Sequence, residues 1–168
     1  GIRDVERSRG LGDVYKRQPE GCNVIIGMSH FIKTVEDIYE VLATNIPGAK
    51  FGLAFNEASS SCLVRYDGTD EDLIENACQI MEKLKCGHLF VILLGDAFPI
   101  SVLNAIKMVP EVCTVYAATA NPVKAVVARL DGQSAFLGVA DGSEPKAREG
   151  KEDKAKRRKF LRDIGYKR

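Results

Sequence analysis

The chemistry that this sequence could perform centres on a histidine at the mouth of an apolar run. His88 stands between Gly87 and LFVILL in the stretch KCGHLFVILLGDAFP, and the chain has only two histidines. At neutral pH an ordinary imidazole keeps a lone pair on one ring nitrogen, so His88 is a candidate nucleophile toward phosphorus. The alternative is a histidine that only hydrogen-bonds a loop carbonyl where a strand begins. His30, in GMSHF, is the second candidate and is expected to be a loop or packing residue.

Polar side chains that could contact a small ligand follow a predicted strand. Asn56 ends the run KFGLAFN and Glu57 comes directly after it. An amide suits a purine edge and a carboxylate suits ribose hydroxyls, whereas a turn with a solvated acid would explain the same two residues. Arg65, in a neighbouring predicted strand, is a candidate donor of hydrogen bonds to a phosphorylated histidine, as is Lys85.

Two further asparagines are candidate ligand contacts. Asn104 is a polar residue in FPISVLNAIK, where the helical pattern would accept an apolar one, so it faces either a pocket or water. Asn121 precedes Pro122, which disfavours helical conformation and directs its amide outward from a strand end. Turn formation alone also explains Asn121.

Several common kinds of site are missing from the sequence. It contains no G-x-x-x-x-G-K-[ST] loop, no G-x-G-x-x-G, no H-E-x-x-H and no G-x-S-x-G elbow. Its five cysteines never form C-x-x-C, so neither a zinc site nor a disulfide framework is expected. Cys86 is two residues from His88, but it ends a predicted helix, where the helix dipole disfavours a thiolate. We therefore expect no metal and no evident cofactor, and the phosphate donor stays unidentified.

The elements that position these residues alternate between strands and helices before a run of strands. Helices are predicted over 34–48, 69–87, 98–110 and 151–167, and strands over 23–27, 50–56, 62–68, 88–94, 112–120, 123–130 and 134–141. This order predicts an α/β fold, a single domain with three layers in which helices cover a mixed β-sheet.

Composition limits where the protein acts and what it binds. The 168 residues carry a net charge of +1, with 45% hydrophobic and 28% charged residues, as in an ordinary soluble globular protein. No apolar run is long enough to span a bilayer, so we expect a cytoplasmic protein that uses no membrane. Residues 1–18 form an expected non-native or disordered leader, because GDVYKRQ looks like translated adapter sequence; the domain is expected over 19–168.

Seven segments, in order from about Pro19 to the end, resemble the adenosine-specific kinase family, small archaeal and bacterial adenosine-binding proteins. They are PEGCNVIIG, KFGLAFNEAS, GHLFVILL, AFPISVLNAIK, PEVCTVYAATANP, GVADG and IGYK. The resemblance implies a three-layer α/β fold, binding of adenosine and AMP, and a histidine that carries phosphate, for which His88 is the candidate. The Gly-Ala-Gly-Asp signature of the larger ribokinase-type adenosine kinases is missing, and LLGDAFP does not replace it.

Three functions follow as hypotheses. The first is an enzyme or phosphocarrier that binds adenosine or AMP and moves phosphate through His88, and the second is a non-catalytic nucleoside-binding sensor. The third, an RNA-associated module that uses the basic C-terminal helix, is disfavoured because no aromatic platform accompanies that helix. The family resemblance and the apolar edge of the same helix, Phe160 with Ile164, favour a homo-oligomer, with a trimer as the first expectation.

Overall fold

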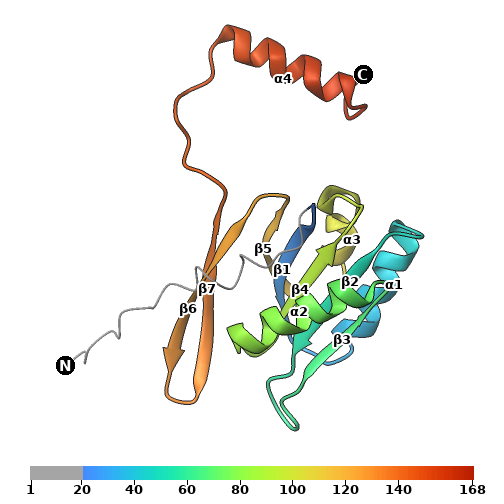
Figure 1. The fold of residues 1–168 in the computed structure, drawn as a ribbon, viewed down its shortest axis with the longest axis vertical. Coiled ribbons are helices and arrows are strands. Elements are labelled where there is room, and N and C mark those ends of the chain that lie inside the picture. The colour runs from blue at the N-terminus through green and yellow to red at the C-terminus, as the bar shows by residue number, and fades with distance from the viewer. Residues whose placement is uncertain (1–20) are drawn as a thin grey trace, which may run out of the picture.

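The computed structural model describes residues 21–168, which form a layered body and a C-terminal arm (Figure 1). The expected leader, residues 1–18, lies outside the described residues. The elements are β1 (Asn23–Ser29), α1 (Thr34–Asn45), β2 (Phe51–Asn56), β3 (Val64–Gly68), α2 (Glu71–Leu84), β4 (Leu89–Leu94), η2 (Pro99–Ser101), α3 (Leu103–Lys107), β5 (Val112–Thr119), β6 (Val123–Leu130), β7 (Gln133–Asp141) and α4 (Lys151–Asp163).

Five strands form the central sheet in the order β3-β2-β4-β1-β5, and β6 with β7 forms a separate hairpin. The α/β class is confirmed, and every pairing between the described strands is antiparallel. The reason is the position of β4. A helix connects β1 to β2, but β4 inserts between these two strands, so that Ile92 lies opposite both Ile25 and Leu53. No two parallel strands therefore become neighbours.

Both faces of the sheet are covered, which produces the expected three layers. The strands LFVILL and FGLAFN are buried at every position, as their unbroken apolar runs predict. Helices α1 and α3 cover one face, and α2 together with the β6–β7 hairpin covers the other. Side chains from these covering elements include Ile38, Leu42 and Ile106 on the first face, and Met81, Leu84, Val127 and Phe136 on the second.

Helix α2 is the element that builds one wall of the site, and its ends are well defined. The Asp70 side chain accepts a hydrogen bond from the Leu73 N–H (3.1 Å), which caps the N-terminus. The helix ends at Leu84, and Lys85, directly after it, has a left-handed backbone (φ +55°). Gly52 of β2 lies directly beneath α2, because an added Cβ would come within 2.2 Å of the Leu73 carbonyl carbon. Glycine at this position therefore lets α2 approach the sheet closely.

Two segments differ from a simple covering helix. The helix predicted over 98–110 is divided into the 3-10 turn η2 and the short helix α3, because Val102 between them leaves helical conformation (φ −124°, ψ −14°). At the other end of the chain, α4 stands away from the layered body (Figure 1) and has no buried residue. None of the helices in residues 21–168 combines the length and apolar character that a membrane span requires.

Candidate nucleoside and phosphate site

His88 lies at one end of the central sheet, which we call the His88 end. This end consists of the last residues of β1 and β2 and the first residues of β3, β4 and β5. The His88 N–H donates to the Asn56 carbonyl (2.7 Å), and the Ser29 N–H donates to the His88 carbonyl (2.9 Å). These two backbone hydrogen bonds fix His88 between β2 and β1 independently of its side chain.

The conformation of His88 is unusual for a residue with a side chain. Its backbone is left-handed (φ +61°), a region that costs a residue with a Cβ about 1–2 kcal/mol and glycine almost nothing. The half-buried ring stacks on Phe55, with centroids 6.0 Å apart and planes inclined by 10°. Gly87, before it, is held close to the Ala58 loop, since an added Cβ would lie 2.8 Å from the Ala58 Cβ. The turn therefore presents the imidazole in one fixed direction.

Asn56 holds the turn and α2 together. Its buried amide donates to the carbonyls of Met81 (3.1 Å) and Cys86 (3.0 Å), so it ties the end of β2 to the C-terminus of α2. Its Oδ1 is buried and accepts no hydrogen bond from the described residues. The residue therefore has a structural role and one unused acceptor.

Glu57 and Arg65 form an ion pair beside Asn56. Arg65 Nη2 donates to Glu57 Oε2 (3.0 Å), and the Leu63 N–H donates to the same oxygen (3.1 Å). The Leu63 N–H and then Arg65 hold the pKa of the Glu57 carboxyl below its usual range, because both stabilise the carboxylate. The Glu57 side chain is only 12% exposed. Since Oε2 is occupied, Oε1 is the oxygen with capacity for a ligand hydroxyl.

A cleft of about 660 Å³ opens between this strand end, α2 and the tip of the β6–β7 hairpin. Asn56, Glu57, Lys85 and Gly87 line it on one side, and the hairpin tip, residues 130–135, lines it on the other. The hairpin is fixed there because Arg129 donates to the carbonyls at the C-terminus of α2, those of Lys83 (2.9 Å) and Leu84 (2.8 Å). The volume lies in the range of small-molecule sites.

The His88 ring and the cleft lie on opposite flanks of the Gly87 turn. The ring stacks on Phe55, which belongs to the face that α1 and α3 cover, whereas the cleft is bounded by α2 and the hairpin. Gly87 lines the cleft and His88 does not. A ligand in the cleft would therefore meet the imidazole only by reaching around this turn.

A second polar cluster lies at the same end, across β1. The His30 N–H donates to the Glu111 carbonyl (3.1 Å), while Lys33 contacts both the Asp37 carboxylate and Glu111 Oε2 (3.2 Å). The Glu111 side chain is 2% exposed, and neither carboxylate oxygen accepts a hydrogen bond from the described residues. Within residues 21–168 no three His, Cys, Asp or Glu side chains are grouped to hold a metal ion.

The structure brings four of the six expected site residues together and places two elsewhere. Asn56, Glu57, Arg65 and His88 share the His88 end. Asn121 lies at the opposite end of the sheet, where its amide donates to Asp141 Oδ1 (3.1 Å). Asn104 is exposed on α3 and does not line the cleft.

Cysteine chemistry has little support at this site. Burial raises the pKa of the Cys86 thiol, and the thiol donates to the Leu84 carbonyl (3.4 Å). Burial likewise raises the pKa of the Cys78 thiol to about 11. Both thiols therefore stay protonated near neutral pH, and a thiolate is the reactive form.

The hairpin tip is the part of the site that sequence reasoning missed. Gln133 and Ser134 line the cleft, and Arg129 positions them. In the sequence they belong to an ordinary hairpin, ARLDGQSA, and no local pattern connects them with residues 56 and 57. Only the register of α2 against the hairpin brings them to the site.

Comparison with known proteins agrees with this architecture. A family model described as adenosine specific kinase matches residues 14–167. The crystal structure of PH1918 protein from Pyrococcus horikoshii OT3 is similar, with 44% sequence identity and a TM-score of 0.85, and the match covers 89% of this chain and 93% of that chain. No curated protein matches the chain significantly. Because the family model spans nearly the whole sequence, the chain belongs to the adenosine-specific kinase family.

Proposed function

We propose that this protein binds adenosine and AMP at the His88 end and transfers phosphate through His88. The observation that carries the proposal is the left-handed, doubly hydrogen-bonded backbone of His88. A glycine would occupy this position without steric cost, so a histidine here runs against the local backbone preference. Membership of the adenosine-specific kinase family supports adenosine as the acceptor.

The proposed transfer has two halves, each a displacement at phosphorus. A ring nitrogen of His88 attacks the phosphorus of a phosphoanhydride donor, the bond to the leaving oxygen breaks, and the imidazole loses its remaining N–H proton. The 5′-hydroxyl oxygen of adenosine then attacks, the N–P bond breaks, and the imidazole takes up the hydroxyl proton. Arg65, which lies opposite Phe55 in the β2–β3 register, is the cation proposed to favour the extra phosphate charge on His88, whereas Lys85 lines the cleft on the other flank of the turn.

The cleft is the proposed place for the nucleoside. Glu57 Oε1 accepts a hydrogen bond from a ribose hydroxyl, and the polar hairpin tip meets the base, while the 5′-end passes around Gly87 toward His88. Because the sequence has no Walker loop to hold a triphosphate, adenosine and AMP should bind more tightly than ATP. Calorimetric titration with the three ligands tests this order.

We also propose a cytoplasmic homo-oligomer, with a trimer as the first expectation. The support is the exposed α4 arm, none of whose residues is buried by the described residues 21–168 of its own subunit. Closed cyclic assembly is the common way for such a surface to be covered.

Variants of the two histidines test the phosphate proposal. The protein is incubated with phosphoramidate or with γ-labelled ATP, and acid-labile, alkali-stable phosphate is measured in wild type, His88→Asn and His30→Asn. We expect label that adenosine chases into AMP in wild type and His30→Asn, and none in His88→Asn. If the phosphate that adenosine converts into AMP were lost in His30→Asn, the assignment of His88 as the phosphate carrier would be wrong. Adenosine binding with no chaseable label in any protein would replace the phosphotransfer proposal with a nucleoside-binding sensor.

A further inference from the structure

Helix α4 is a basic arm whose apolar residues are left uncovered. Its 13 residues, Lys151–Asp163, contain seven basic and three acidic side chains, and none is buried. Phe160 is 59% exposed and Ile164, directly after the helix, is 46% exposed. A helix of this kind has little reason to stand alone in water, because its stability normally comes from packing one face against another element.

The apolar and basic residues of α4 share one stripe. Lys156, Phe160 and Ile164 are spaced four apart, so they lie above one another on the same side of the helix. Neighbouring charges are already used locally: Arg157 pairs with Glu149 (2.9 Å) and Lys159 pairs with Asp163 (2.6 Å). Lys156 makes no ion pair within the described part of the chain, and it remains available to an acidic partner.

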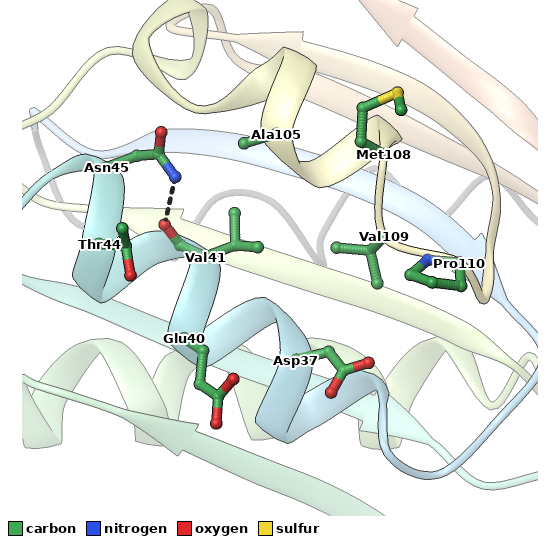
Figure 2. A pocket seen from close by; sticks show the side chains of 9 residues that line it. All are labelled: Asp37, Glu40, Val41, Thr44, Asn45, Ala105, Met108, Val109 and Pro110. Carbon is green, nitrogen blue, oxygen red and sulfur yellow. Dashed lines mark hydrogen bonds between the residues drawn. The ribbon is translucent and has the colours of Figure 1, made fainter.

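A groove on the far side of the body has the complementary character. It lies between α1 and α3, has a volume of about 480 Å³, and is lined by Val41, Ala105, Met108 and Val109 (Figure 2). Met108 is 81% exposed, an unusual degree for a methionine in a folded body. Glu40, also exposed, forms part of the groove wall.

The acidic charge of α1 beside the groove complements the basic charge of α4. Helix α1 carries three acidic side chains, Glu36, Asp37 and Glu40, and no basic one, whereas α4 has a net charge of +4. We propose that α4 of one copy docks into the α1–α3 groove of a second copy. Phe160 then packs against Met108 and Ala105, and Lys156 faces the acidic side of α1. This is the helix-in-groove mode of recognition.

A second copy fits better than the subunit's own arm. The chain leaves the body from β7, in the layer that packs with α2, whereas the groove lies on the opposite face of the sheet. Residues 142–150 connect β7 to α4, and the helix stands apart from the layered body without resting on α1 or α3 (Figure 1). An arm that docks on a neighbour leaves this path unchanged, and identical copies can each give and receive one arm.

Two single variants and their mixture test the proposal with the full chain. Met108→Glu places a charge in the groove and Phe160→Glu places one on the arm; both positions are exposed, so the fold should be kept. Light scattering should show an oligomer for wild type and loss of assembly for each variant. Leu137→Glu, at a 62% exposed position on β7, is the matched control and should assemble like wild type.

Mixing the two variants separates docking between copies from docking within one. The Met108→Glu chain keeps an intact arm and the Phe160→Glu chain keeps an intact groove, so the mixture should regain a species of higher mass. Wild-type assembly by both single variants would overturn the proposal. A monomeric wild type, or a mixture of the variants that stays monomeric, would overturn it as well, the first by pointing to an arm docked on its own subunit.

Discussion

Both ends of the central sheet contain left-handed backbone positions, but different residue types occupy them. At the end opposite His88, the turn after β7 uses Gly142 for its left-handed residue (φ +63°). There the Thr119 hydroxyl and the Asn121 amide both donate to Asp141 Oδ1, at 3.0 and 3.1 Å. At the His88 end, Lys85 and His88, both residues with side chains, have left-handed backbones.

Buried polar atoms without a hydrogen bond are also concentrated at one end of the sheet. Among the described residues, the buried side-chain nitrogen and oxygen atoms without a hydrogen bond belong to Asn56, Arg65 and Glu111, all at the His88 end. Native proteins leave few such atoms, and each costs free energy. One end of the sheet is thus built for stability, whereas the other carries strain and unused polar atoms that a ligand site would explain.

Removing the Asn56 amide should have the largest effect. Asn56→Ala removes the side-chain donor to the buried Cys86 carbonyl and one of two donors to the Met81 carbonyl, which keeps the Lys85 N–H, so the free energy of unfolding should fall by about 2–4 kcal/mol. Urea unfolding measures this. Adenosine affinity should fall with it, because the same amide holds the turn that leads to His88. A stability change below about 1 kcal/mol would show that Asn56 does not tie β2 to α2.

Glu57→Gln should separate binding from stability. Loss of the carboxylate should weaken adenosine binding by about 1–3 kcal/mol, because a charged acceptor for a ribose hydroxyl becomes a neutral amide. Thermal unfolding at neutral pH should change little by comparison. Calorimetric titration with adenosine is the measurement. Unchanged affinity for adenosine would show that Glu57 is only a turn residue.

The same kind of change at the opposite end should spare the ligand. Asn121→Ala removes one exposed hydrogen bond to Asp141 and should cost about 1 kcal/mol or less of stability. Adenosine affinity should stay at the wild-type value. If this variant lost affinity like Glu57→Gln, the functional contrast between the two ends would be wrong.

The smallest expected effect is on the ionisation of Glu57. The lowered pKa means that the carboxylate adds stability above the ordinary value of 4.5, and this contribution is lost as pH falls through the lowered value. Arg65→Gln should raise the pKa only part of the way back, since the Leu63 N–H, the larger cause, remains. Carboxyl NMR titration checks this. A full return to the ordinary value would show that Arg65 dominates.

Local pattern predicted the elements well because it depends on neighbouring residues. Apolar runs such as LFVILL and the helical spacing of Leu73, Ala77 and Leu84 specify burial without any long-range information. The position of β4 between β1 and β2 depends on pairing across the chain, so alternation alone suggested parallel neighbours. The helix predicted over 98–110 breaks at Val102, and this break could not be predicted because the residue is neither Gly nor Pro.

The grouping of the candidate site residues was predictable in part for the same reason. Residues 56, 57, 65 and 88 stand at strand ends in the sequence, and strand ends meet when the sheet forms. The left-handed backbone of His88 follows no local signal, and the hairpin tip reaches the cleft only through Arg129. Asn104 and Asn121 carry equally polar side chains, but the fold places them away from this end.

The most direct test of the His88 account is the substitution His88→Gly. Glycine adopts φ +61° without strain, which offsets the lost stacking on Phe55, so the free energy of unfolding should change by less than about 1 kcal/mol. The variant should at the same time lose all acid-labile phosphate that adenosine chases into AMP. Stability and phosphate transfer are measured on the same preparation, by urea unfolding and by the chase. A variant that keeps the chaseable phosphate would contradict the claim that the histidine ring is retained for phosphate transfer.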